Sequence, residues 1–147
     1  MNDELPVDAL LADFPPEIRA TAHELRRIVA TAVGDAVEHI VPGWRLIRYT
    51  IPVGRGRTRM FASIGPELVH VHLFLECGVL VPDPDRLLEG AHLHLKRVRF
   101  LTFAPEIHVP ETVIAAFLRA AAGVAVLPAD ARRALADAGA EPVPTEG

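Results

Sequence analysis

The sequence predicts an α+β domain in which a short antiparallel sheet of about five strands packs against helices near both ends of the chain. Three observations support this prediction. Helical spacing of apolar residues is confined to the two ends, two-residue alternation occupies the middle, and no strand–helix–strand alternation occurs. The length of 147 residues, with 23% charged side chains, suits one hydrophobic core.

The first long helix is expected to begin at Pro15-Pro16, because proline fits the first turn of a helix, and to end at Gly34-Asp35. A short helix over residues 5–13 is expected to precede it. The buried stripe of the long helix follows from apolar residues at helical spacing: Ile18, Ala22, Leu25, Val29 and Ala32.

Alternating apolar residues predict the strands, and glycine and proline mark the turns between them. The expected strands span 38–41, 45–53, 58–64, 68–75 and 98–103. Residues 76–95 are expected to be irregular, with room for one helical turn over 85–89. The chain should then form a helix opening at Pro110-Glu111, an alanine-rich helix from Pro128 to Ala138, and a loose tail over 139–147.

The two faces of the predicted sheet follow from parity, since side chains alternate across a strand. The face expected beneath the helices collects Ile47, Tyr49, Ile51, Met60, Ala62, Ile64, Val69, Val71, Leu73, Leu75, Val98 and Phe100. The opposite face collects Arg48, Thr50, Arg59, Phe61, Ser63, His70, His72, Arg97 and Arg99. A slip of one residue in the pairing of any strand would exchange its faces.

The second face is predicted to bind a small anionic or phosphate-bearing ligand, or an acidic partner segment. Guanidinium groups bind carboxylate and phosphate bidentately, and histidine titrates near neutral pH. The predicted ligand-binding residues are Arg48, Arg59, His70, His72, Arg97 and Arg99. Two alternatives stay open: these side chains are solvated strand edges and hairpin tips, or the acidic residues of segment 3–13 neutralise them within the molecule.

Histidines occur two apart in His70-Val71-His72 and in His92-Leu93-His94, so each pair would point to one side of a strand. Two such pairs could surround a metal ion. Nothing in the sequence shows that the pairs meet. We therefore expect no metal ligands and no cofactor, with zinc or ferrous iron binding weakly or not at all.

Several functions lack their sequence signals. The chain has no G-x-S-x-G elbow, phosphate loop, G-x-G-x-x-G or H-E-x-x-H motif, so we predict no catalytic residue and a non-enzymatic binding role. No apolar run reaches about 18 residues, which argues against a membrane span. The single Cys77 excludes an internal disulfide, and a cytoplasmic location is expected. The net charge of −4 and few aromatic residues argue against nucleic-acid binding, and the sequence does not distinguish a monomer from a dimer.

Several segments resemble the YdhG-like family of proteins of unknown function. They are Phe14-Pro15-Pro16-Glu17-Ile18-Arg19, Leu25-Arg26-Arg27-Ile28-Val29, Leu46-Ile47-Arg48-Tyr49-Thr50-Ile51-Pro52, Ser63-Ile64-Gly65-Pro66, His70-Val71, Leu80-Val81-Pro82-Asp83-Pro84, Leu87-Leu88-Glu89-Gly90 and Lys96-Arg97-Val98-Arg99. The resemblance covers roughly residues 10–122. It implies an α+β fold with a bent antiparallel sheet and a distant similarity to frataxin-type iron-binding proteins, but no established activity. His72 departs from the family pattern, which has asparagine there.

With that resemblance the chain divides into three segments. Residues 1–13 form an acidic arm or short helix, residues 14–122 a YdhG-like α+β domain, and residues 123–147 a C-terminal helix and loose tail. The resemblance also supplies an alternative function, frataxin-like binding or chaperoning of a metal such as iron.

Overall fold

The computed structural model describes residues 6–105 and 107–139 of the chain. Within these residues a five-stranded sheet forms the centre of the fold, with every neighbouring pair antiparallel and the strands in chain order. This arrangement confirms the predicted α+β class. The strands are β1 (Val37–Val41), β2 (Leu46–Gly54), β3 (Arg57–Pro66), β4 (Val71–Leu75) and β5 (Arg99–Phe103).

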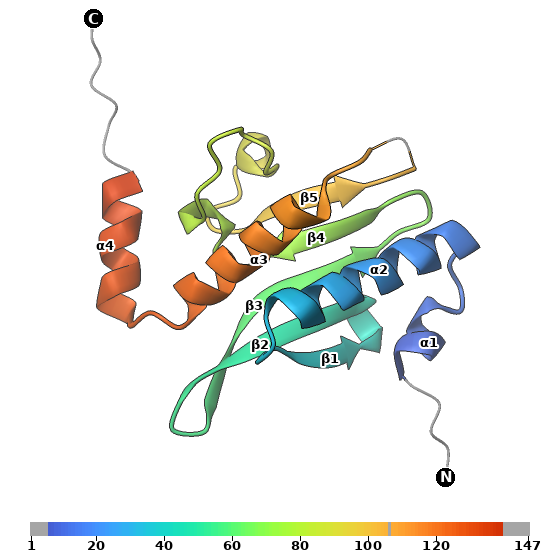
Figure 1. Ribbon diagram of the computed structural model, residues 1–147, viewed down its shortest axis with the longest axis horizontal. Helices are drawn as coiled ribbons and strands as arrows, with labels where there is room; N and C mark the ends of the chain where they lie inside the picture. The colour runs from blue at the N-terminus through green and yellow to red at the C-terminus, as the bar shows by residue number, and fades with distance from the viewer. Residues whose placement is uncertain (1–5, 106, 140–147) are drawn as a thin grey trace, which may run out of the picture.

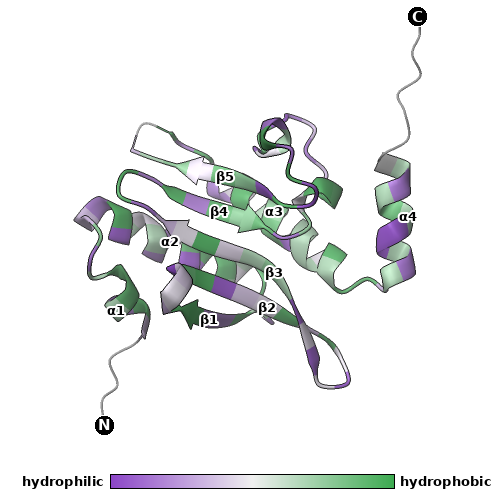
Figure 2. Ribbon diagram, turned by 180° about the vertical axis from the view of Figure 1, so that it is seen from behind, coloured by the Kyte–Doolittle hydropathy of each residue, from purple (hydrophilic) through white to green (hydrophobic). Residues whose placement is uncertain are grey.

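Helices cover one face of this sheet. Helices α2 and α3 lie across it, α1 packs beside β1, and α4 follows the C-terminal end of α3 (Figure 1). Among the described residues no α-helix covers the opposite face, and we call it the open face (Figure 2). None of the described helices is long and apolar enough to cross a membrane. The helices are α1 (Pro6–Leu11), α2 (Pro16–Ala32), α3 (Glu111–Ala125) and α4 (Ala129–Gly139).

Helix α2 forms as its sequence pattern predicts. Pro16 occupies the first turn, where a missing N–H costs nothing, and the Val33 N–H closes the last turn by donating to the Val29 carbonyl at 2.9 Å. The apolar stripe of the helix is buried against the sheet, and its members are Ile18, Ala22, Leu25, Ile28 and Val29. The burial of this stripe, more than helix propensity, holds α2 in place.

The fourth strand begins later than the expected 68–75. The Glu67 N–H donates to the His70 carbonyl at 2.8 Å, which closes a tight turn around Leu68 and Val69. Val69 is 68% exposed at the tip of this turn, so its assignment to the core was wrong. The predicted helical turn over 85–89 is also absent: the Asp83 carboxylate accepts from the Leu87 and Leu88 N–H groups, and Glu89 pairs with β5 instead.

In the middle of its pairing with β2, strand β3 contains one extra residue. Tyr49 pairs with Ala62, but the next residue of β2, Thr50, pairs with Met60. Phe61 is therefore the extra residue of a β-bulge, and its side chain is buried in the core. Beyond the bulge, parity is inverted. The faces predicted for three residues were wrong for this reason: Met60 turns to the open face, whereas Arg59 and Phe61 belong to the helix-covered side.

The register of β5 also differs from the expectation. Leu75 pairs with Arg99 and Leu73 with Leu101, which puts Arg99 on the helix-covered side. Phe100 lies opposite Phe74 on the open face instead of in the main core. Parity could not decide this strand, because Phe100, Leu101 and Phe103 supply apolar side chains to both faces. The expected short helix over 5–13 is present as α1, whereas residues 1–5 of the acidic arm and residues 140–147 of the tail lie outside the described part of the chain.

The two valines near the β3–β4 turn provide a test of the fold. Val71 is fully buried against the helices, so Val71→Asp should destabilise the domain by roughly 4 kcal/mol or more, because it buries an unpaired charge. The matched control is Val69→Asp at the exposed turn, which should change the free energy of unfolding by less than about 0.5 kcal/mol. Urea unfolding followed by circular dichroism measures both. Similar unfolding midpoints for the two variants would contradict the assigned faces.

Candidate functional site

The turn between β3 and β4 gathers three polar side chains at the open face. Glu67 and His70 flank the turn, and the hydrogen bond between their backbones sets them opposite each other. His72 lies two residues further along β4, so it projects to the same face as His70. Its strand partners are Gly65 on β3 and Thr102 on β5.

The ligand atoms of this Glu67–His70–His72 triad lie within 4.8 Å of one another. The two carboxylate oxygens of Glu67 lie 3.6 Å from Nε2 of His70 and 3.5 Å from Nε2 of His72. Zinc binds such atoms at roughly 2.0–2.2 Å, so neighbouring ligand atoms of a tetrahedral site are about 3.3–3.6 Å apart. The carboxylate–imidazole spacings of the triad therefore fit metal coordination as well as direct ion pairing.

His72 has the most enclosed position of the triad. Its side chain is 16% exposed, against 56% for Glu67. Nδ1 of His72 lies 3.2 Å from the hydroxyl oxygen of Thr102, and the ring also packs against Phe74 and Phe100. Burial, followed by the nearby His70, lowers the pKa of His72 below its ordinary value of 6.5, although Glu67 opposes the shift. Its imidazole is therefore neutral at pH 7, which is the form that binds metals.

The second histidine pair lies apart from the triad. His92 and His94 are exposed in the segment between β4 and β5, and among the described residues neither joins a group with metal-ligand spacing. Glu67 and Thr102 were missed by the sequence analysis. The available signal for Glu67 was its place three residues before His70, since a two-residue turn makes those positions neighbours across a hairpin.

The arginines of the predicted anion-binding face do not share one surface. Arg48 is exposed on the open face, where its cross-strand partners are His39 of β1 and Ser63 of β3. The guanidinium group of Arg99 donates to the carbonyls of Leu95 and Val98 at 2.9 and 2.8 Å, which ties down the preceding segment.

Arg59 and Arg97 instead line a cavity of about 220 Å³ on the other side of the sheet. The six predicted residues are thus divided between the histidine triad, the exposed Arg48, the backbone-bound Arg99 and this cavity. The prediction of one continuous Arg–His face was wrong, because the bulge at Phe61 and the register of β5 invert parity where arginines occur.

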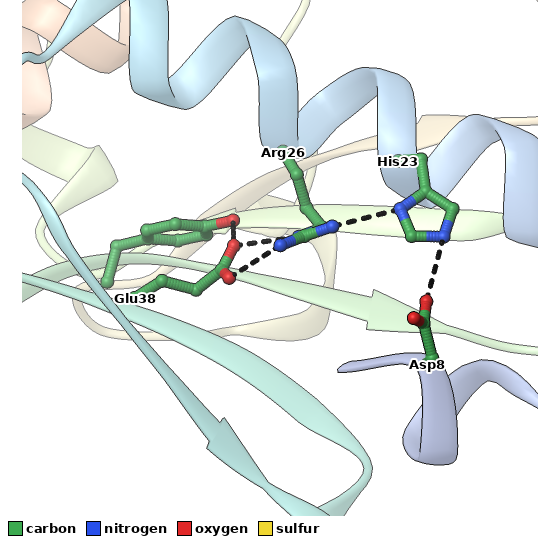
Figure 3. A network of polar contacts seen from close by, with 5 residues as sticks. Asp8, His23, Arg26 and Glu38 are labelled. Atoms are coloured by element: carbon green, nitrogen blue, oxygen red, sulfur yellow. Dashed lines mark hydrogen bonds and ion pairs between the residues drawn. The ribbon is translucent and has the colours of Figure 1, made fainter. Parts of the chain in front are cut away.

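A separate polar network joins α1 and α2 to the edge of the sheet (Figure 3). Arg26 of α2 makes a bidentate contact with Glu38 of β1, with N–O distances of 2.8 and 2.9 Å. The Tyr49 hydroxyl donates to the same carboxylate at 2.7 Å. On its other side, Arg26 contacts Nδ1 of His23 at 3.0 Å, and the second ring nitrogen of His23 lies 3.8 Å from Asp8.

The charges of this network are balanced within the fold. Burial alone would raise the pKa of Glu38, but hydrogen bonds from Arg26 and Tyr49 outweigh it and hold the pKa below 4.5. Burial, and then the hydrogen bond to Glu38, raises the pKa of Tyr49 far above its ordinary value. Because each group has a partner of complementary charge or hydrogen-bonding role, the network is best understood as a structural clamp between helix and sheet.

Comparison of the chain with protein-family models, curated protein sequences and solved structures found no significant match. The resemblance to the YdhG-like family therefore stays a prediction. The function is argued below from the residues and their geometry.

The clamp predicts a pH-dependent stability difference. The pKa of Glu38 is depressed in the folded state. Its contribution to the free energy of unfolding is therefore fully present above the unfolded pKa of about 4.3 and is lost as the pH falls through the folded pKa. Glu38→Gln should therefore cost about 1–3 kcal/mol at pH 7, and the difference from wild type should shrink as the pH is lowered below 4.5.

Urea unfolding at several pH values measures this difference. The control is Glu24→Gln, which breaks the exposed Glu24–Arg27 pair of α2 and should change stability little. A penalty for Glu38→Gln that stays constant down to acidic pH would contradict the ionic clamp.

Proposed function

We propose that this protein is a non-enzymatic binding domain that holds a divalent transition metal ion, preferably zinc, at the Glu67–His70–His72 triad. The observation that carries the proposal is the convergence of one carboxylate and two imidazole groups on a single hairpin, with carboxylate–imidazole spacings near those of a tetrahedral site. This adopts the metal-binding alternative of the sequence analysis with a different ligand set, since Glu67 takes the place of the second histidine pair.

The chemistry of the three ligands favours zinc over harder ions. Two imidazole nitrogens and one carboxylate suit zinc and neighbouring first-row metals, whereas calcium and magnesium prefer shells made only of oxygen. The Thr102 hydroxyl supports the same assignment. If Nδ1 of His72 donates its hydrogen to Thr102, then Nε2 carries the lone pair and faces the Glu67 carboxylate.

Three protein ligands leave at least one coordination position open in a tetrahedral ion. Glu67 also lines a cavity of about 390 Å³ whose other walls include Trp44, Leu46 and Phe74. An ion held by Glu67 would therefore lie at the edge of a space that can admit a small ligand. The buried core packs through Val71 and Leu73 independently of the triad, so a metal ion is not needed to hold the fold together. We therefore infer a role in metal binding or delivery. The sequence predicts that this role is carried out in the cytosol.

Calorimetric titration at neutral pH tests the site. Zinc should bind with one-to-one stoichiometry and a dissociation constant of about 1 μM or tighter. His72→Ala should weaken binding by roughly a hundredfold, because it removes a ligand from the most enclosed corner of the triad. The matched control is His94→Ala, which removes an exposed histidine outside the triad and should leave the isotherm unchanged. Binding that is absent in the wild type, or equal in both variants, would reject the proposal.

Thr102 provides a finer test of the same site. Thr102→Val retains the shape of the side chain but removes the hydroxyl that contacts Nδ1 of His72. Zinc affinity should fall about tenfold while the stoichiometry stays at one, as expected when a group that orients a ligand is lost. If affinity is unchanged, Thr102 does not orient His72 for metal binding.

A further inference from the structure

A second candidate site lies on the helix-covered side of the sheet, away from the histidine triad. It is a cavity of about 220 Å³ lined by residues of β3, of the segment after β4 and of the two C-terminal helices. Three arginines from separate parts of the chain line it: Arg59 of β3, Arg97 before β5 and Arg132 of α4. Arg132 was not among the residues that the sequence analysis selected.

Two of these arginines meet at one backbone carbonyl. Nη1 of Arg132 donates to the Leu127 carbonyl at 2.5 Å, and Nη1 of Arg59 approaches the same oxygen at 3.5 Å while also contacting the Ala125 carbonyl. A guanidinium group has five N–H donors. The hydrogen bonds of Arg59 and Arg132 within the described chain use Nη1 alone, so the other donors of both groups have no partner among the described residues.

The charge around the cavity is unbalanced. Three arginines line it together with one acidic residue, Glu76, and among the described residues none of the three arginines forms an ion pair. The carbonyls at the end of α3 offset part of the excess, by roughly half an elementary charge. Like charges repel, so the guanidinium groups of Arg59 and Arg132, which share the Leu127 carbonyl, disfavour each other, and an anion beside them would relieve that repulsion.

We propose that this cavity binds a phosphate-type oxyanion, either the free ion or a phosphoryl group carried by a metabolite. Planar guanidinium forks match the oxygens of such an anion, and charge-assisted hydrogen bonds of this kind are strong. The volume supports a small ligand, since pockets for drug-sized molecules begin at about 300 Å³. This site is independent of the proposed metal centre.

The test uses the full chain, treated with a chelator, and inorganic phosphate at low ionic strength. Phosphate should raise the melting temperature of the wild type through mass action, and added sodium chloride should reduce the gain. Arg97→Ala should weaken phosphate binding roughly tenfold or more, the effect of losing one charge-assisted contact. Arg97 is exposed and outside the core, so this variant should fold.

Two further variants sharpen the test. Glu76→Gln removes the carboxylate that opposes an anion, so it should tighten phosphate binding about threefold, a change opposite in sign to that of Arg97→Ala. Arg48→Ala removes one exposed arginine from the open face and should behave as wild type. His72→Ala should also bind phosphate normally, which separates this site from the metal centre.

Glycerol 3-phosphate and glycerol identify the source of the anion. If the free ion is the ligand, glycerol 3-phosphate should bind more weakly than phosphate. If a phosphoryl group on a metabolite is the ligand, glycerol 3-phosphate should bind at least as tightly as phosphate. Glycerol should not shift the melting temperature. The proposal is overturned if phosphate does not stabilise the wild type, if Arg97→Ala and Arg48→Ala respond equally, or if Glu76→Gln binds no more tightly than wild type.

Discussion

The extra residue at Phe61 is the constraint on which the layout of the molecule depends. At the bulge β3 has two residues where β2 has one, which inverts the alternation of side chains from Met60 to Thr58. Phe61 then fills the core, and Arg59 moves from the open face to the side covered by α3. Without the bulge, Arg59 would lie with Arg48 on the open face. The same residue thus completes the hydrophobic core and separates the two candidate sites.

The turn at the other end of β3 sets the spacing of the triad side chains. A two-residue turn makes Glu67 and His70 neighbours, and strand alternation adds His72 to the same face. Because the three side chains are mounted on one hairpin, their spacing depends little on how the helices pack. This differs from the arginine cavity, whose walls come from β3, the segment between β4 and β5, α3 and α4, and which therefore requires the complete tertiary fold.

Arginine has three separate uses in this protein. Arg26 pairs with Glu38 to clamp α2 to the sheet, Arg99 binds carbonyls of an irregular segment, and Arg59 binds carbonyls at the end of α3. The first use neutralises a charge, whereas the other two leave the positive charge without a carboxylate partner in the described chain. A clustering of arginines in the sequence therefore does not by itself indicate a ligand site. The tertiary neighbours of each guanidinium group decide its use.

By itself the sequence determined the type and order of the elements. Periodicity, together with proline and glycine at the boundaries, is a local property, so helices such as α2 and strands such as β2 could be predicted closely. The tertiary structure decided which side chains share a face. That depends on pairing between strands, where one inserted residue at Phe61 or a one-step slip at Phe100 reverses the outcome. His70 and His72 could be paired from sequence because two residues of one strand suffice. Thr102 and Arg132 could not, since contacts across strands and helices bring them to their sites. Glu67 needed only the position of the two-residue turn, which was missed because the fourth strand was expected to begin at residue 68.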